Sequence, residues 1–106
     1  MKTLTIDGFK ISPENKTFII AELSANHGGK LEVALDTISA AKRAGADAIK
    51  LQTYTADTIT LDSKTEHFKI NKDTLWDGQF LYELYQKAQM PWEWHHALFD
   101  HAKKEG

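Results

Sequence analysis

Two short apolar runs, separated by an amphipathic segment with glycines at both ends, constrain the fold of this chain most strongly. The first run opens residues 18–29 with β-branched side chains, as a buried strand does. After Gly28-Gly29, apolar residues recur at helical spacing until Ala44-Gly45, where glycine is typical of a helix C-terminus. Residues 47–52 form a second strand-like run. This order predicts a βαβ unit, which is a parallel pair with a right-handed crossover.

Alternation along the two predicted strands divides their side chains between two faces. Ile49 and Leu51 share one face and are expected to pack on helices, because successive strand residues point in opposite directions. Lys50 and Gln52 point to the other face. If the strands are neighbours in a barrel, Glu22, Lys50 and Gln52 converge at its C-terminal mouth, where barrel enzymes keep their sites. The alternation therefore predicts a polar site at the strand ends.

A predicted hairpin precedes the βαβ unit, and a long irregular segment follows it. Asp7-Gly8 separates two short apolar runs and predicts a β-hairpin, so residues 1–17 are expected to be an accessory cover. Residues 53–77 have no clear period. A connection of this length is usually functional or disordered. This one is expected to pack, because it contains the apolar residues Phe68, Ile70, Leu75 and Trp76. A helical turn is expected near residues 56–60.

Two further helices are predicted before the chain ends. They occupy residues 78–89 and 91–105, and Pro91 is expected in the first turn of the second helix, where its missing N–H costs nothing. A third strand is the next element expected, and the sequence stops at Gly106 without it. A complete (β/α)8 barrel takes about 250 residues. The expected fold is therefore α/β, with residues 18–106 forming the first two βα units of an incomplete barrel.

Composition and charge give no sign of a nucleic-acid or membrane partner. Thirteen basic against fifteen acidic residues give a formal charge of −2, without the basic stripe that is typical of nucleic-acid binding. No segment approaches the length of a membrane span, and the first residues lack the apolar core of a secretory signal. A cytoplasmic protein is therefore expected. The sequence has no cysteine, which excludes disulfides and thiolate metal sites.

The charged residues at the predicted strand ends each have a structural and a functional interpretation. Glu22 is either a paired structural acid or a catalytic one, because an unpaired buried charge is costly. Lys50 is either half of a buried ion pair or a cationic contact for an anionic ligand, with the Gln52 amide as a second donor. The pattern alone leaves both alternatives open.

Other candidate residues carry weaker signals. His27 stands alone in the turn, where histidines are more commonly structural or exposed. Trp76 is the best of the three tryptophans for contact with a sugar ring, although core packing is the commoner use of such residues. No complete metal site is predicted within the chain, because no two histidines have the spacing of three or four residues that a helical metal pair needs.

Several motifs resemble the sialic acid synthase family, whose best-known members are N-acetylneuraminate synthases. The sequence Ile-Ile-Ala-Glu-Leu-Ser-Ala-Asn-His at residues 19–27 is followed by Gly-Ala-Asp-Ala-Ile-Lys-Leu-Gln-Thr at 45–53. Residues 52–60, 74–78 and 91–95 are similar to the pseudaminic acid synthase branch. The resemblance covers nearly all of residues 17–106, with the motifs in the family's order, so it is far more specific than any single motif.

The resemblance implies a (β/α)8 barrel followed by a small antifreeze-like domain, in a domain-swapped homodimer. Members condense phosphoenolpyruvate with an N-acetylated aminosugar, giving a nine-carbon acid and phosphate, with Mn²⁺ or Mg²⁺ as a Lewis acid. In this branch the sugar is a di-N-acetylated trideoxy-altrose. The alternatives within the family are N-acetylneuraminate and legionaminate synthases. The alternative of another class is a non-catalytic sugar-binding or interaction module.

The resemblance also assigns roles to residues of this chain. Lys50 and Gln52 match the family's phosphoenolpyruvate contacts, and Glu22 matches the catalytic acid beside the metal and the sugar. The family's metal-binding histidines lie in later strands, so no metal ligand is expected in this fragment and the isolated fragment is expected to be inactive. The positions expected near the sugar are Asn26, His27, Tyr54 and Trp76.

Overall fold

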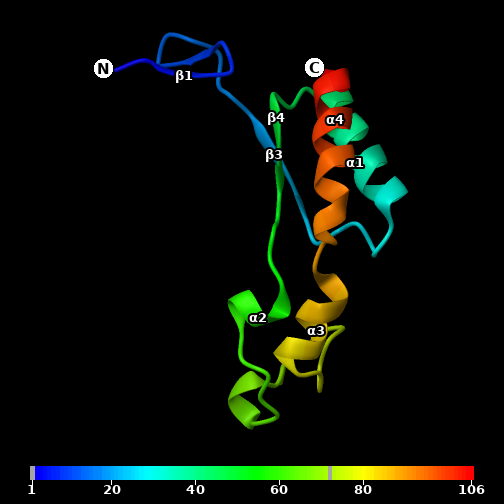
Figure 1. The fold of residues 1–106 in the computed structure, drawn as a ribbon. Coiled ribbons are helices and arrows are strands. Elements are labelled where there is room, and N and C mark those ends of the chain that lie inside the picture. The colour runs from blue at the N-terminus through cyan, green and yellow to red at the C-terminus, as the bar shows by residue number, and fades with distance from the viewer. Residues whose placement is uncertain (1, 72) are drawn as a thin grey trace.

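The chain is laid out in three parts along one direction (Figure 1). A computed structural model describes residues 2–71 and 73–106, and it shows an N-terminal hairpin, a central layer of strands and helices, and a small helical lobe. The radius of gyration is 17.4 Å, whereas a compact domain of this length has about 13 Å. The extended shape leaves the open face of the central strands accessible.

The central layer is the βαβ unit that the sequence predicts. Strands β3 (Ile20–Ser24) and β4 (Ala48–Leu51) pair in parallel, and helix α1 (Leu31–Arg43) connects them. Gly45 follows the helix with φ of +96°, a left-handed conformation that glycine adopts without steric cost. The predicted hairpin is also confirmed, with β1 (Leu4–Ile6) antiparallel to β2 (Phe9–Ile11).

Two helices cover one face of the β3–β4 pair. Helix α4 (His95–Glu105) lies beside α1 (Figure 1), and their facing sides meet the strands in one apolar core. The predicted alternation is confirmed, since Leu23, Ile49 and Leu51 all pack in this core. The fully buried core residues are Leu23, Ala34, Ile38, Met90 and Leu98.

The opposite face of the strand pair is open and mostly polar toward its C-terminal end. Ile20 is 53% exposed on this face, and the Glu22 and Lys50 side chains follow it in the same orientation. Because parallel sheets are normally covered on both faces, the exposure marks a surface that is suited to further packing or to ligand binding. The prediction of a polar face at the strand ends is therefore confirmed.

A helical lobe lies beyond the C-terminal end of β4 (Figure 1). It holds α2 (Ala56–Ile59), the 3₁₀ turn η1 (Glu66–Phe68) and α3 (Leu81–Ala88), and a second 3₁₀ turn, η2 (Trp92–Trp94), leads into α4. The Ala56 N–H donates to Gln89 Oε1 at 3.0 Å, which ties α2 to the end of α3. None of the helices in the described residues is long and apolar enough to cross a membrane.

Three sequence expectations need correction in and near this lobe. Helix α3 begins at Leu81 rather than at residue 78, because the preceding residues pair with another segment: the Gly78 N–H donates to the Ile70 carbonyl at 2.8 Å, and Phe80 forms an antiparallel bridge with Lys69. Pro91 has ψ of 131°, so it precedes η2 and is not in a helical turn. Leu75 is 92% exposed and does not pack, whereas Ile70 is half-buried as expected.

The helix–strand core gives a direct test of the packing. We expect Ile38→Val to lower the free energy of unfolding by about 1 kcal/mol, because Ile38 is 3% exposed and the lost methylene leaves a small cavity. The matched control is Ile59→Val on α2, where the side chain is 47% exposed and the change should be below about 0.5 kcal/mol. Urea unfolding midpoints measure both, and equal losses would contradict the core assignment.

Candidate active site at the strand ends

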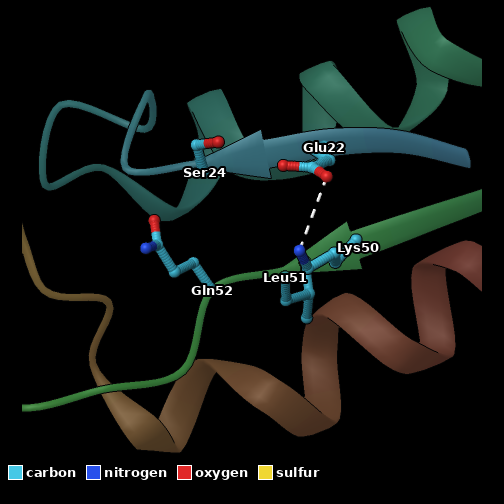
Figure 2. A pocket seen from close by; sticks show the side chains of 5 residues that line it. All are labelled: Glu22, Ser24, Lys50, Leu51 and Gln52. Atoms are coloured by element: carbon cyan, nitrogen blue, oxygen red, sulfur yellow. Dashed lines mark hydrogen bonds and ion pairs between the residues drawn. The ribbon is translucent and has the colours of Figure 1, made fainter.

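Glu22 and Lys50 face each other across the two parallel strands. They are register partners in the β3–β4 pair, and Lys50 Nζ lies 3.4 Å from Glu22 Oε1 (Figure 2). Their side chains are 59% and 63% exposed, respectively. Exposed ion pairs contribute about 0–1 kcal/mol to stability, so within the described residues this pair adds little to stability, and both alternatives for Lys50 stay predictions. The two charges are held together and remain accessible to a ligand.

The pair lines a shallow depression together with the end of β4. Figure 2 shows the Gln52 side chain extending from the segment after β4 toward the turn that follows β3, with Ser24 at the end of β3. The depression has a volume of about 80 Å³, well below the 300–1,000 Å³ that are typical of pockets for drug-sized ligands. It therefore has room for a group the size of a phosphate or carboxylate. The lining residues are Glu22, Ser24, Lys50, Leu51 and Gln52.

Ser24 also lines the depression, although the sequence predicted no role for it. The register shifts between Glu22 and Ser24, so that Ser24 pairs with Leu51. Its φ of +52° is a left-handed conformation for a residue with a side chain, and such strain costs about 1–3 kcal/mol and clusters at functional sites. The register shift interrupts the alternation after Glu22, so the signal for Ser24 was its place among the polar residues at the end of the first strand-like run.

Asn26 and His27 lie in the turn after β3 and do not line the depression. Asn26 is exposed, whereas His27 is 1% exposed. The Gly29 N–H donates to His27 Nδ1 at 3.0 Å, and the imidazole packs edge-on with Trp94 at a centroid distance of 5.3 Å. In the described part of the chain, His27 Nε2 is buried without a hydrogen-bond partner. The contacts make His27 part of the packing under the turn, and its predicted role near the sugar stays a prediction.

Tyr54 and Trp76 also lie away from the depression. Tyr54 is in the segment that leads into the helical lobe, and Trp76 is within the lobe. Tyr54 is 6% exposed and packs edge-on with Tyr85 at a centroid distance of 5.8 Å. Burial, and secondarily the neighbouring Tyr85, raises the pKa of the Tyr54 phenol above 10.0. Trp76 is 49% exposed, so its indole is available for a contact. Both predicted sugar contacts stay predictions.

The described residues do not by themselves fit a divalent metal. Across residues 2–71 and 73–106, no group of three or more histidine, aspartate or glutamate side chains gathers where it could hold an ion. A catalytic zinc-type site takes about three protein ligands. Glu22 alone supplies a carboxylate in the depression, and one carboxylate falls short of that number.

The fold and the site together define an α/β protein with accessible polar groups at the C-terminal ends of parallel strands, which is the arrangement of many enzymes. The model of the NeuB family matches residues 37–106. The chain belongs to the NeuB family.

Individual members of the family are similar to this chain. Pseudaminic acid synthase from Campylobacter jejuni is 60% identical over 93 residues, which are 88% of this chain and 27% of that protein. The enzyme of the same name from Helicobacter pylori is 55% identical over 81% of this chain and 25% of that protein. The crystal structure of N-acetylneuraminic acid synthetase from Leptospira borgpetersenii in complex with citrate matches with a TM-score of 0.71, at 32% identity, over 98% of this chain and 31% of that one. The chain thus spans about a quarter of the length of these pseudaminic acid synthases.

Proposed function

We propose that the protein encoded by the whole reading frame is a pseudaminic acid synthase with a (β/α)8 barrel. The identity of 60% to the Campylobacter jejuni enzyme carries this proposal, because it exceeds what a shared fold alone requires. The substrates would be phosphoenolpyruvate and a di-N-acetylated trideoxy-altrose. The proposal includes a homodimer in the cytoplasm. It also includes a divalent metal, Mn²⁺ or Mg²⁺, whose ligands would not come from a cluster of residues in this chain.

The site chemistry fits the phosphoenolpyruvate half of the reaction. The substrate carries a phosphate and a carboxylate, and the Lys50 ammonium is a compact cation on the accessible face of β4. The Gln52 amide lines the same depression and adds a neutral hydrogen-bond donor for the phosphate or carboxylate oxygens of the substrate. A depression of about 80 Å³ accommodates one of these anionic groups, so the rest of the substrate would extend over the open face.

In the proposed reaction, the C2=C3 π electrons of phosphoenolpyruvate form a bond from C3 to the aldehyde carbon of the open-chain sugar, the aldehyde C=O π bond breaks, and its oxygen takes up a proton and becomes a hydroxyl. Water then adds to the cationic C2 and loses a proton. The C2–O bond to phosphate breaks, phosphate leaves with the electron pair, and the C2 hydroxyl loses its proton to become the ketone. Glu22 would accept the proton of the attacking water, because its carboxylate is held beside the phosphoenolpyruvate-binding cation. Lys50 and Gln52 would bind the substrate and orient it for both steps.

Phosphate release tests the function directly. The whole reading frame is expressed, and the protein is incubated with phosphoenolpyruvate and Mn²⁺ plus either the altro sugar or N-acetylmannosamine. We expect phosphate release with the altro sugar and a nine-carbon acid among the products. Turnover only with N-acetylmannosamine would reject the branch and favour an N-acetylneuraminate synthase. A folded protein that turns over neither sugar, nor the precursor of legionaminate, would favour the non-catalytic module.

A further inference from the structure

We propose that His95 is a positioning residue that fixes the backbone carrying Gln52, through a hydrogen bond to Thr53. This inference rests on the proposed function, since it assigns His95 to the phosphoenolpyruvate half of that site. His95 itself does not line the depression, so its effect on the substrate would be transmitted by the chain segment that it holds.

The hydrogen bonds of His95 determine which ring nitrogen carries the proton. Nδ1 lies 2.8 Å from the Trp92 carbonyl oxygen, and Nε2 lies 2.7 Å from Thr53 Oγ1. A carbonyl only accepts, so Nδ1 donates and carries the hydrogen of the neutral ring. Nε2 is then the acceptor, and the Thr53 hydroxyl donates to it. The imidazole therefore connects η2 to the first residue after Gln52 by two directed bonds.

The segment after β4 depends on side-chain contacts of this kind. Strand β4 ends at Leu51, and residues 52–55 have no regular secondary structure. Thr53 is bonded to His95, and the next residue, Tyr54, is buried against Tyr85 of α3. Gln52 thus lies between the end of the strand ladder and two consecutive anchors. Releasing the Thr53 anchor should let the Gln52 amide move away from the position in which it lines the depression.

The contact also explains a sequence motif that the site does not otherwise use. Residues 91–95 place Trp92 and His95 three apart, and η2 brings their rings to a centroid distance of 6.5 Å. The Trp92 carbonyl faces Nδ1 in the same turn, so the turn fixes the ring and directs Nε2 toward Thr53. The bond to Thr53 thus reaches outside the turn that holds the ring.

A double-mutant cycle in the protein from the whole reading frame tests the inference. Thr53→Val removes the hydroxyl with little change of shape, and His95→Phe keeps an aromatic ring without either nitrogen. We expect each variant to raise the KM for phosphoenolpyruvate about fivefold, because the freedom that Gln52 gains when this internal hydrogen bond is lost must be removed again on binding. The double variant should show the same fivefold rise rather than about 25-fold, because both changes break one bond. The KM for the sugar and kcat should change less than about twofold.

His96→Phe is the matched control, because His96 is the exposed neighbour of His95 on α4 and should leave both KM values unchanged. If the wild type is active and both single variants keep its KM for phosphoenolpyruvate, the inference is overturned and the proposed function stands. Independent effects that multiply to about 25-fold would also overturn it. If the wild type is inactive, the proposed function fails, and ¹⁵N NMR still decides the geometry. A protonated Nδ1 and an unprotonated Nε2 in neutral His95 are expected, and the opposite tautomer would overturn the inference.

Discussion

The Glu22→Gln variant should lose about 100- to 1,000-fold in kcat, the usual loss when a general base is removed, while its KM for phosphoenolpyruvate stays the same or falls. The amide keeps the shape of the side chain but cannot accept a proton. Glu22 Oε1 lies 3.4 Å from Lys50 Nζ, so its negative charge opposes an anionic substrate at the same cation. Removing that charge therefore does not weaken phosphoenolpyruvate binding. Steady-state phosphate release, measured at saturating sugar, separates the two parameters.

The control for this variant is Glu32→Gln, which removes a carboxylate in the first turn of α1, on an exposed side chain away from the depression. Its kcat should be within about twofold of wild type. If Glu22→Gln instead raised the KM for phosphoenolpyruvate and left kcat unchanged, Glu22 would be a binding residue and not the proton acceptor.

The Lys50→Ala variant should show the complementary result. We expect the KM for phosphoenolpyruvate to rise roughly 30- to 150-fold, corresponding to the loss of about 2–3 kcal/mol from a charged hydrogen bond. In the 106-residue chain the free energy of unfolding should change by less than about 1 kcal/mol, because both side chains of the ion pair are exposed there. A purely structural lysine would give the reverse pattern, in which stability falls and substrate affinity does not.

Two comparisons sharpen the Lys50 test. Lys50→Arg keeps the charge but replaces a compact ammonium by a planar guanidinium, so it should restore only part of the affinity. Lys103→Ala removes an exposed lysine from the last turn of α4 and should leave the KM for phosphoenolpyruvate unchanged. Equal effects of Lys50→Ala and Lys103→Ala would indicate that general charge, and not a specific contact, attracts the substrate.

Much of the central layer follows from local sequence signals. The change from strand to helical periodicity after Gly28-Gly29 and the glycine at Gly45 give the βαβ unit, because each signal acts over a few residues. Alternation in β4 places Lys50 on the face opposite Ile49, and this placement depends only on strand geometry. The facing of Glu22 and Lys50 is therefore as predictable as the strands themselves, provided that the strands are neighbours.

The features that could not be predicted depend on contacts between distant segments. The start of α3 is set by a hydrogen bond from Gly78 to Ile70, which no periodicity reveals. The register shift beside Ser24 arises from pairing with β4, and the burial of His27 arises from Trp94 of η2. Thr53 gave no signal of its own, since its partner His95 lies 42 residues further along the chain.

A crystal structure of the protein from the whole reading frame, grown with phosphoenolpyruvate, tests the central claim most directly. That claim is that the depression between β3 and β4 binds the anionic end of this substrate. The predicted result is phosphoenolpyruvate with an anionic group within hydrogen-bond distance of Lys50 Nζ and the Gln52 amide. Phosphoenolpyruvate bound elsewhere, with Lys50 Nζ in contact with Glu22 alone, would contradict the account.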